Sequence, residues 1–130
     1  MYKPLLNALE RIDAPAGTLL WNQGDPSDGL FLIESGVLSS TYEFPNRKDT
    51  FSESMVGGTL AGELSALSGL PRNSRVVAEK DAVLWKLSME DLARLEEQHP
   101  DLMRDFLHLV LKGNSTPQNP FLTRLLTGNF

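Results

Sequence analysis

Short apolar runs separated by turn residues recur between residues 18 and 87, and this pattern constrains the fold most strongly. Glycine, proline, asparagine, aspartate and serine fill the gaps, and these residues favour turns. Short strands at regular intervals with turn signals between them indicate an all-β sandwich or barrel. The pattern predicts strands over residues 18–21, 30–33, 37–44, 50–56, 75–78 and 82–87.

Helical patterns lie at both ends of this β region. Leucines and an isoleucine at helical spacing predict a short amphipathic helix over residues 4–13. Ser88, with an aspartate three residues later, has the pattern of a capping box and predicts a helix over residues 88–98. Pro100 breaks that helix, and the apolar residues that follow predict another over 101–112. The chain is therefore predicted to be mainly β with flanking helices.

The composition narrows the possible classes of protein. A chain of 130 residues is long enough for one domain with a substantial core. It has no cysteine, which excludes disulfides, thiolate zinc sites and cysteine nucleophiles. It has no apolar run long enough to span a membrane, and its N-terminus lacks the apolar core of a signal peptide. We therefore expect a cytoplasmic protein that does not insert into membranes.

The segment from Gly62 to Val76 reads Gly-Glu-Leu-Ser-Ala-Leu-Ser-Gly-Leu-Pro-Arg-Asn-Ser-Arg-Val and contains the groups that a sugar-phosphate requires. Gly62 allows close backbone approach, and backbone N–H groups at a turn attract anions. Glu63 can accept hydrogen bonds from sugar hydroxyls. Arg72 can bind phosphate oxygens through two parallel N–H donors.

This segment resembles the phosphate-binding cassette of the cyclic nucleotide-binding domain family, the type found in protein kinase A regulatory subunits and the catabolite activator protein. The family pattern is Gly-Glu-Leu, a short helix, then Pro-Arg followed by small residues. The resemblance covers roughly residues 5–112 and includes glycine-containing turns at Gly17, Gly24, Gly36 and Gly58. It implies a double-stranded β-helix jelly roll, with a domain over residues 1–112 and a tail over 113–130.

The resemblance also implies the ligand and its binding residues. The ligand would be cAMP or cGMP, with no separate cofactor and no metal. Arg72 would bind the exocyclic phosphate oxygens, and Glu63 would accept a hydrogen bond from the ribose 2′-OH. The implied site consists of Gly62, Glu63, Leu64, Ser65, Arg72, Asn73 and Ser74. Asn73 can both donate and accept, so it does not decide between adenine and guanine. The Ser88–Lys112 helices would transmit ligand occupancy.

Other interpretations stay open at the level of sequence. Arg72 could be a surface arginine paired with a nearby carboxylate, and structural need alone could explain Gly62 and Leu64. A degenerate domain would bind no nucleotide and act as a protein-interaction module, and Ala61 and Arg75 depart from the family pattern in its favour. An enzyme on a cupin-type barrel would need a cluster of metal-binding histidines, which the two distant histidines do not supply.

The remaining expectations concern catalysis and partners. No nucleophile elbow surrounds any serine, and the family resemblance implies a sensor and not an enzyme. Trp21 and Trp85 are expected in the core. The net charge of −5 and the few residues after Lys112 argue against nucleic acid as a partner. We expect the domain to serve an effector in a larger host protein, or to form a homo-oligomer.

Overall fold

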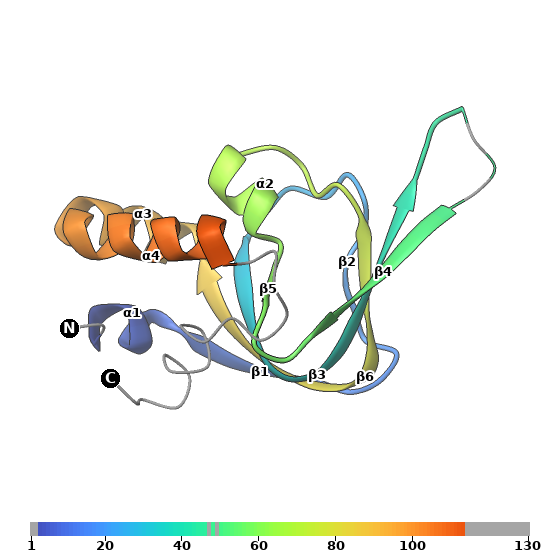
Figure 1. The fold of residues 1–130 in the computed structure, drawn as a ribbon, viewed down its shortest axis with the longest axis horizontal. Coiled ribbons are helices and arrows are strands. Elements are labelled where there is room, and N and C mark those ends of the chain that lie inside the picture. The colour runs from blue at the N-terminus through green and yellow to red at the C-terminus, as the bar shows by residue number, and fades with distance from the viewer. Residues whose placement is uncertain (1–2, 47, 49, 114–130) are drawn as a thin grey trace.

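The computed structural model describes residues 3–46, 48 and 50–113 (Figure 1). The predicted tail over 113–130 therefore lies outside the described residues, apart from Gly113. The elements in chain order are α1 (Lys3–Ala8), β1 (Glu10–Ala14), β2 (Leu19–Trp21), β3 (Gly29–Glu43), β4 (Thr50–Val56), β5 (Leu60–Ala61), α2 (Glu63–Ser68), β6 (Arg75–Ser88), α3 (Met89–Gln98) and α4 (Pro100–Gly113).

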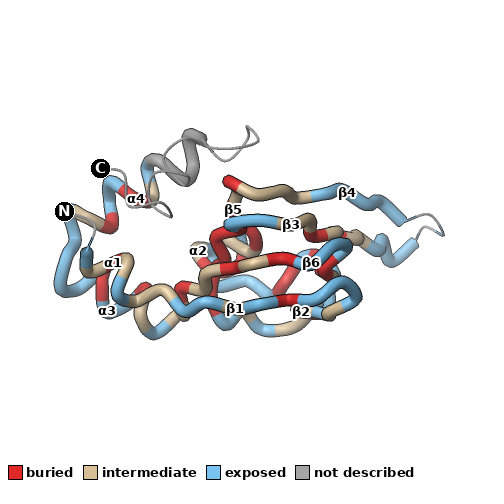
Figure 2. The backbone as a smooth tube through the Cα atoms, turned by 90° about the horizontal axis from the view of Figure 1, so that it is seen from below, coloured by how far each residue is buried: buried red, intermediate tan, exposed pale blue. Residues whose placement is uncertain are grey.

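The strands form one strongly curved antiparallel sheet in the order β1-β6-β3-β4. In addition, β2 pairs with β6, and β5 pairs with β3. Helices α1, α3 and α4 gather at one end of the sheet, and the hairpin formed by β3 and β4 projects from the other (Figures 1 and 2). This arrangement confirms the prediction of a mainly β jelly roll with flanking helices.

In two cases, a pair of strands predicted separately forms one long strand in the structure. Residues 30–33 and 37–44 belong to β3, and residues 75–78 and 82–87 belong to β6. The register between β3 and β6 shifts repeatedly between Ile33 and Leu38, so the strands bend together without separating. Gly36 lies at this bend with φ of 93°, and a Cβ there would come within 2.4 Å of the Asp81 carbonyl oxygen. The turn residues thus produce a bend in a continuous ladder.

The predicted helix over residues 4–13 is wrong in its second half. Helix α1 ends at Ala8, and Glu10–Ala14 forms β1, which pairs with residues 82–86 of β6. Leu5, in the helical part, is fully buried. The hydrogen bonds offered by the edge of β6 outweigh the helical spacing of the apolar residues, because that spacing reports burial and not backbone pairing.

The core has two parts, one on each side of β3. Leu30 and Leu32 face the helices and pack with Leu87, Leu92, Met103 and Phe106. Phe31 and Ile33 face the inside of the curved sheet and pack with Trp21, Leu38, Val76 and Leu84. Both faces of this strand are therefore buried, which explains its continuous apolar run.

The C-terminal helices follow the sequence prediction closely. Ser88 is the N-cap of α3, and its Oγ accepts a hydrogen bond from the Asp91 backbone N–H at 3.1 Å. Helix α4 begins at Pro100 immediately after α3 ends, as the predicted break at that proline requires. Of the helices in the described part of the chain, none has both the length and the apolar character needed to cross a membrane.

Candidate functional site

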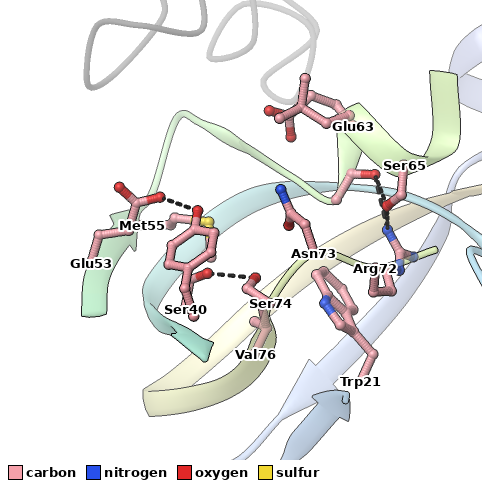
Figure 3. Close-up of a pocket in the computed structure, with 13 residues that line it drawn as sticks. Trp21, Ser40, Glu53, Met55, Glu63, Ser65, Arg72, Asn73, Ser74 and Val76 are labelled. Atoms are coloured by element: carbon pink, nitrogen blue, oxygen red, sulfur yellow. Dashed lines mark hydrogen bonds between the residues drawn. The ribbon is translucent and has the colours of Figure 1, made fainter. Parts of the chain in front are cut away.

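A cavity opens between α2 and the strands β2, β3, β4 and β6 (Figure 3). One side of it comes from the cassette segment, and the opposite side comes from β3 and β4. Its lining consists of Trp21, Ser40, Tyr42, Glu53, Met55, Gly62, Glu63, Leu64, Ser65, Arg72, Asn73, Ser74 and Val76. All seven residues of the site implied by the sequence therefore lie around this one cavity.

Gly62 connects β5 to α2 and brings the backbone close to Arg72. It caps α2 in the left-handed region with φ of 74°. A Cβ at this position would lie 2.3 Å from Arg72 Nη1 and 3.1 Å from the Trp21 ring. Both the conformation and the available space therefore require glycine here.

Arg72 is the central cation of the site, and its side chain is only 1% exposed. Its Nη1 donates to the Gly62 carbonyl oxygen at 2.9 Å and to Ser65 Oγ at 3.1 Å. Its Nη2 donates to Asp28 Oδ1 at 3.0 Å and to the Gly29 carbonyl oxygen at 2.7 Å. The alternative of a surface arginine is therefore wrong, because the guanidinium is buried. It does pair with a carboxylate, that of Asp28.

The π face and the Nε of the same guanidinium complete its surroundings. Its carbon lies 4.0 Å from the centroid of the Trp21 ring, which in turn stacks on Phe31 at 5.4 Å. Trp21 is a core residue, as predicted, but it also lines the cavity. Arg72 Nε is buried and has no hydrogen-bond partner within the described part of the chain. A buried donor left without an acceptor costs about 1–3 kcal/mol.

The charges around Arg72 influence one another. Burial lowers the pKa of the Arg72 guanidinium, and Asp28 partly offsets this effect. The group stays cationic because guanidinium does not deprotonate in proteins. Partial burial tends to raise the pKa of Asp28, but Lys86, at 2.7 Å, and Arg72 outweigh it, so that the pKa is lowered. Asp28 is thus a carboxylate shared by two cations.

Asp28 and Gly29 also contact the start of the C-terminal helices. The Asp28 carbonyl oxygen accepts a hydrogen bond from the Met89 backbone N–H at 3.1 Å, and Met89 is the first residue of α3. Gly29 pairs with Ser88, the N-cap of that helix. The dipeptide that holds Arg72 therefore also holds the first turn of α3.

The wall opposite α2 contains residues that sequence reasoning missed. Ser40 Oγ donates to Ser74 Oγ at 2.7 Å, and the Tyr42 hydroxyl donates to Glu53 Oε1 at 2.8 Å. A signal for them was present, because Ser40 and Tyr42 share one face of a strand with the buried Leu38. Polar residues on an otherwise apolar face indicate a lined cavity. Asp28 is one of the residues on which the family resemblance rests, but its contact with Arg72 has no local signal in the sequence.

Two features noted in the sequence lie away from this cavity. Arg75, which departs from the family pattern, is exposed on β6 and is not among the lining residues, so it is a solvent-facing strand residue. The two histidines, His99 and His108, lie after α3 and on α4. In the described residues, no group of three or more histidine, aspartate and glutamate side chains could hold a metal ion.

Comparisons with known proteins agree with the fold. The family model described as "Cyclic nucleotide-binding domain" matches residues 11–99. The chain is 34% identical over 100 residues to a cAMP-dependent protein kinase regulatory subunit of Aspergillus niger, covering 77% of this chain and 24% of that protein. It is 33% identical over 95 residues to a lysophospholipase of the same species, covering 73% of this chain and 6% of that protein.

Solved structures show the same similarity. A cyclic nucleotide-binding domain from Methylobacillus flagellatus superposes with a TM-score of 0.74 at 28% identity, covering 97% of this chain and 64% of that chain. The catabolite activator protein of Thermus thermophilus superposes with a TM-score of 0.71 at 28% identity, covering 82% of this chain and 50% of that chain. The chain belongs to the cyclic nucleotide-binding domain family. It spans about a quarter or less of the two sequence relatives named above.

Proposed function

We propose that this domain is a ligand-sensing module that binds a cyclic mononucleotide, cAMP or cGMP, in the cavity beside α2. Arg72 carries the proposal. It is a buried cation that lines the cavity, and its Nε lacks an acceptor in the described part of the chain. A phosphate oxygen supplies such an acceptor and a compensating negative charge. The family membership and the relative that is a cAMP-dependent protein kinase regulatory subunit support this choice of ligand.

The remaining cassette residues would position the sugar and the phosphate. Glu63 lines the cavity near the start of α2, where its carboxylate would accept a hydrogen bond from the ribose 2′-OH (Figure 3). The backbone N–H groups of Leu64 and Ser65 belong to the first turn of a helix, so they have no intrahelical acceptor. Gly62, Asn73 and Ser74 would complete the contacts around the phosphate.

Occupancy would reach the C-terminal helices through the dipeptide Asp28–Gly29. A phosphate on Arg72 competes with the acceptors that now hold its guanidinium, and two of these belong to that dipeptide. Because the Asp28 carbonyl also holds the Met89 N–H, a shift of the dipeptide changes the start of α3. The module would then control an effector in a larger host protein. The lysophospholipase that contains a matching segment illustrates such a host.

Calorimetry with cAMP and cGMP tests the proposal. Arg72→Lys keeps the charge but loses the planar fork of donors, so affinity should fall by at least about tenfold. Arg75→Lys is the matched control, because it changes a neighbouring arginine that is exposed and lies outside the cavity. If the Arg72→Lys variant binds as tightly as the parent domain, the role of Arg72 is contradicted.

One observation favours a second function, that of a degenerate domain acting as a protein-interaction module. Both terminal nitrogens of Arg72 are already occupied by groups of the chain itself, so the residue could be purely structural. Leu64, in the first turn of α2, and Leu70, just after that helix, are 62% and 65% exposed and would supply an apolar contact surface. A melting temperature unmoved by millimolar cAMP and cGMP would favour this alternative. A sensor saturated at a hundred times its Kd should gain about 2.7 kcal/mol, or about 10 °C.

A further inference from the structure

The wall of the cavity opposite Arg72 carries a carboxylate, Glu53. Ser40 on β3 stands directly across from Glu53 on β4, and Tyr42 lies diagonally across from it. Side chains at these positions project from the same face of the hairpin, toward the cavity. Figure 3 shows Glu53 on one side of the cavity and Arg72 on the other. The two ends of the cavity therefore differ in charge.

Tyr42 holds Glu53 in one orientation. Its hydroxyl donates to Glu53 Oε1 at 2.8 Å, which leaves the other carboxylate oxygen without a hydrogen bond to the described residues. Burial, and then this hydrogen bond, raise the pKa of Tyr42, so the phenol stays a donor at neutral pH. With its proton used on Glu53, the phenol oxygen offers only lone pairs to a ligand. Met55, the neighbouring lining residue, carries only a weak acceptor.

This end of the cavity thus presents acceptors to any ligand held at the other end. With the phosphate at Arg72 and the ribose at Glu63, a purine base would extend toward β3 and β4. The substituent at purine position 6 points away from the sugar and is an amino donor in adenine but a carbonyl acceptor in guanine. A carboxylate opposite position 6 accepts from the amino group and repels the carbonyl oxygen. One opposite N1 would instead meet a lone pair in adenine and an N–H donor in a 6-oxo purine, so this selection requires Glu53 to lie opposite position 6.

We infer that Glu53, oriented by Tyr42, is the residue that selects the base, and that it favours a 6-amino purine over a 6-oxo purine. The inference rests on the proposed binding of a cyclic nucleotide in this cavity and adds the identity of the base. Asn73 stands between the two walls (Figure 3) and does not discriminate, since its amide both donates and accepts.

Affinities for three cyclic nucleotides test the inference: cAMP, cyclic 3′,5′-IMP, which carries a 6-oxo group, and purine riboside 3′,5′-cyclic monophosphate, which lacks the substituent. The parent domain should bind cAMP about tenfold more tightly than the other two, a modest factor because Glu53 lies at the exposed rim. Glu53→Gln should remove or reverse the preference over the 6-oxo nucleotide, because a glutamine amide can donate to the carbonyl. Tyr42→Phe should reduce the preference by freeing the carboxylate.

Glu43→Gln is the matched control, because Glu43 is an exposed glutamate of the same hairpin that does not line the cavity, and it should leave the preference unchanged. Equal binding of cAMP and cyclic IMP by the parent domain would overturn the role of Glu53 but not the proposed function. Tighter binding of the 6-oxo nucleotide would also overturn it. If none of the three nucleotides binds, the proposed function is overturned, and the assignment of Glu53 with it.

Discussion

Gly62 and Arg72 are in direct contact: Arg72 Nη1 donates to the Gly62 carbonyl oxygen at 2.9 Å, and the missing side chain of Gly62 is what leaves room for the guanidinium. The glycine and the arginine of the cassette therefore depend on each other. The same contact couples the conformation of the turn before α2 to the position of the cation in the cavity.

Gly62→Ala should destabilise the fold by about 2–4 kcal/mol, combining the left-handed backbone conformation with overpacking. Gly69→Ala is the matched control, since Gly69 has a similar φ of 76° but open space where its Cβ would be. The control should lose only the conformational part, about 1–2 kcal/mol. Urea unfolding of both variants measures the difference, and equal losses would show that the Arg72 guanidinium moves aside freely.

Trp21 should be energetically coupled to Arg72 through the contact of the guanidinium with its ring. A double-mutant cycle between Trp21→Leu and Arg72→Met should give a coupling of about 1–2 kcal/mol, the range for a desolvated cation–π pair. The corresponding cycle with Arg75→Met is the control, and it should be additive because Arg75 is exposed to solvent. Measured unfolding free energies give both couplings. An additive result for Arg72 would show that the guanidinium and the Trp21 ring lie close together without any coupling energy.

Asp28 should make stability depend on pH in the acid range. Its pKa in the folded state lies below the ordinary value of 3.8, so its contribution is complete above that value and is lost as the pH falls through the folded-state pKa. The difference in melting temperature between the parent and Asp28→Asn should therefore shrink below about pH 4. Asp101→Asn, which removes an exposed ion pair on α4, is the control. A difference that stays constant down to pH 2 would contradict this account.

Ligand binding should change hydrogen exchange at the start of α3. If the module is a sensor, saturating cyclic nucleotide should alter the protection of the Met89 N–H, whose acceptor is the Asp28 carbonyl oxygen. Asp28→Asn should reduce that response, because it weakens the link between Arg72 and the dipeptide. Mass-spectrometric exchange over residues 86–98 measures both. Unchanged protection in the liganded parent domain would exclude this route.

The sequence alone determined the class of fold and one side of the candidate site. Turn residues between short apolar runs define strands locally, and the capping pattern at Ser88 marks the start of α3, because these features depend on neighbouring residues. The cassette segment is also contiguous, so its glycine, carboxylate and arginine could be identified together. All of them lie at the cavity that the structure shows.

Only the tertiary structure decided which groups face the cassette. Asp28 meets Arg72 across 44 residues, and Tyr42 and Glu53 reach the cavity through the register of β3 against β4. It also decided that Glu10–Ala14 pairs with β6 and that β3 stays continuous through Gly36. These outcomes depend on backbone hydrogen bonds and close packing between distant segments, and a local pattern in the sequence does not identify the partners in such interactions.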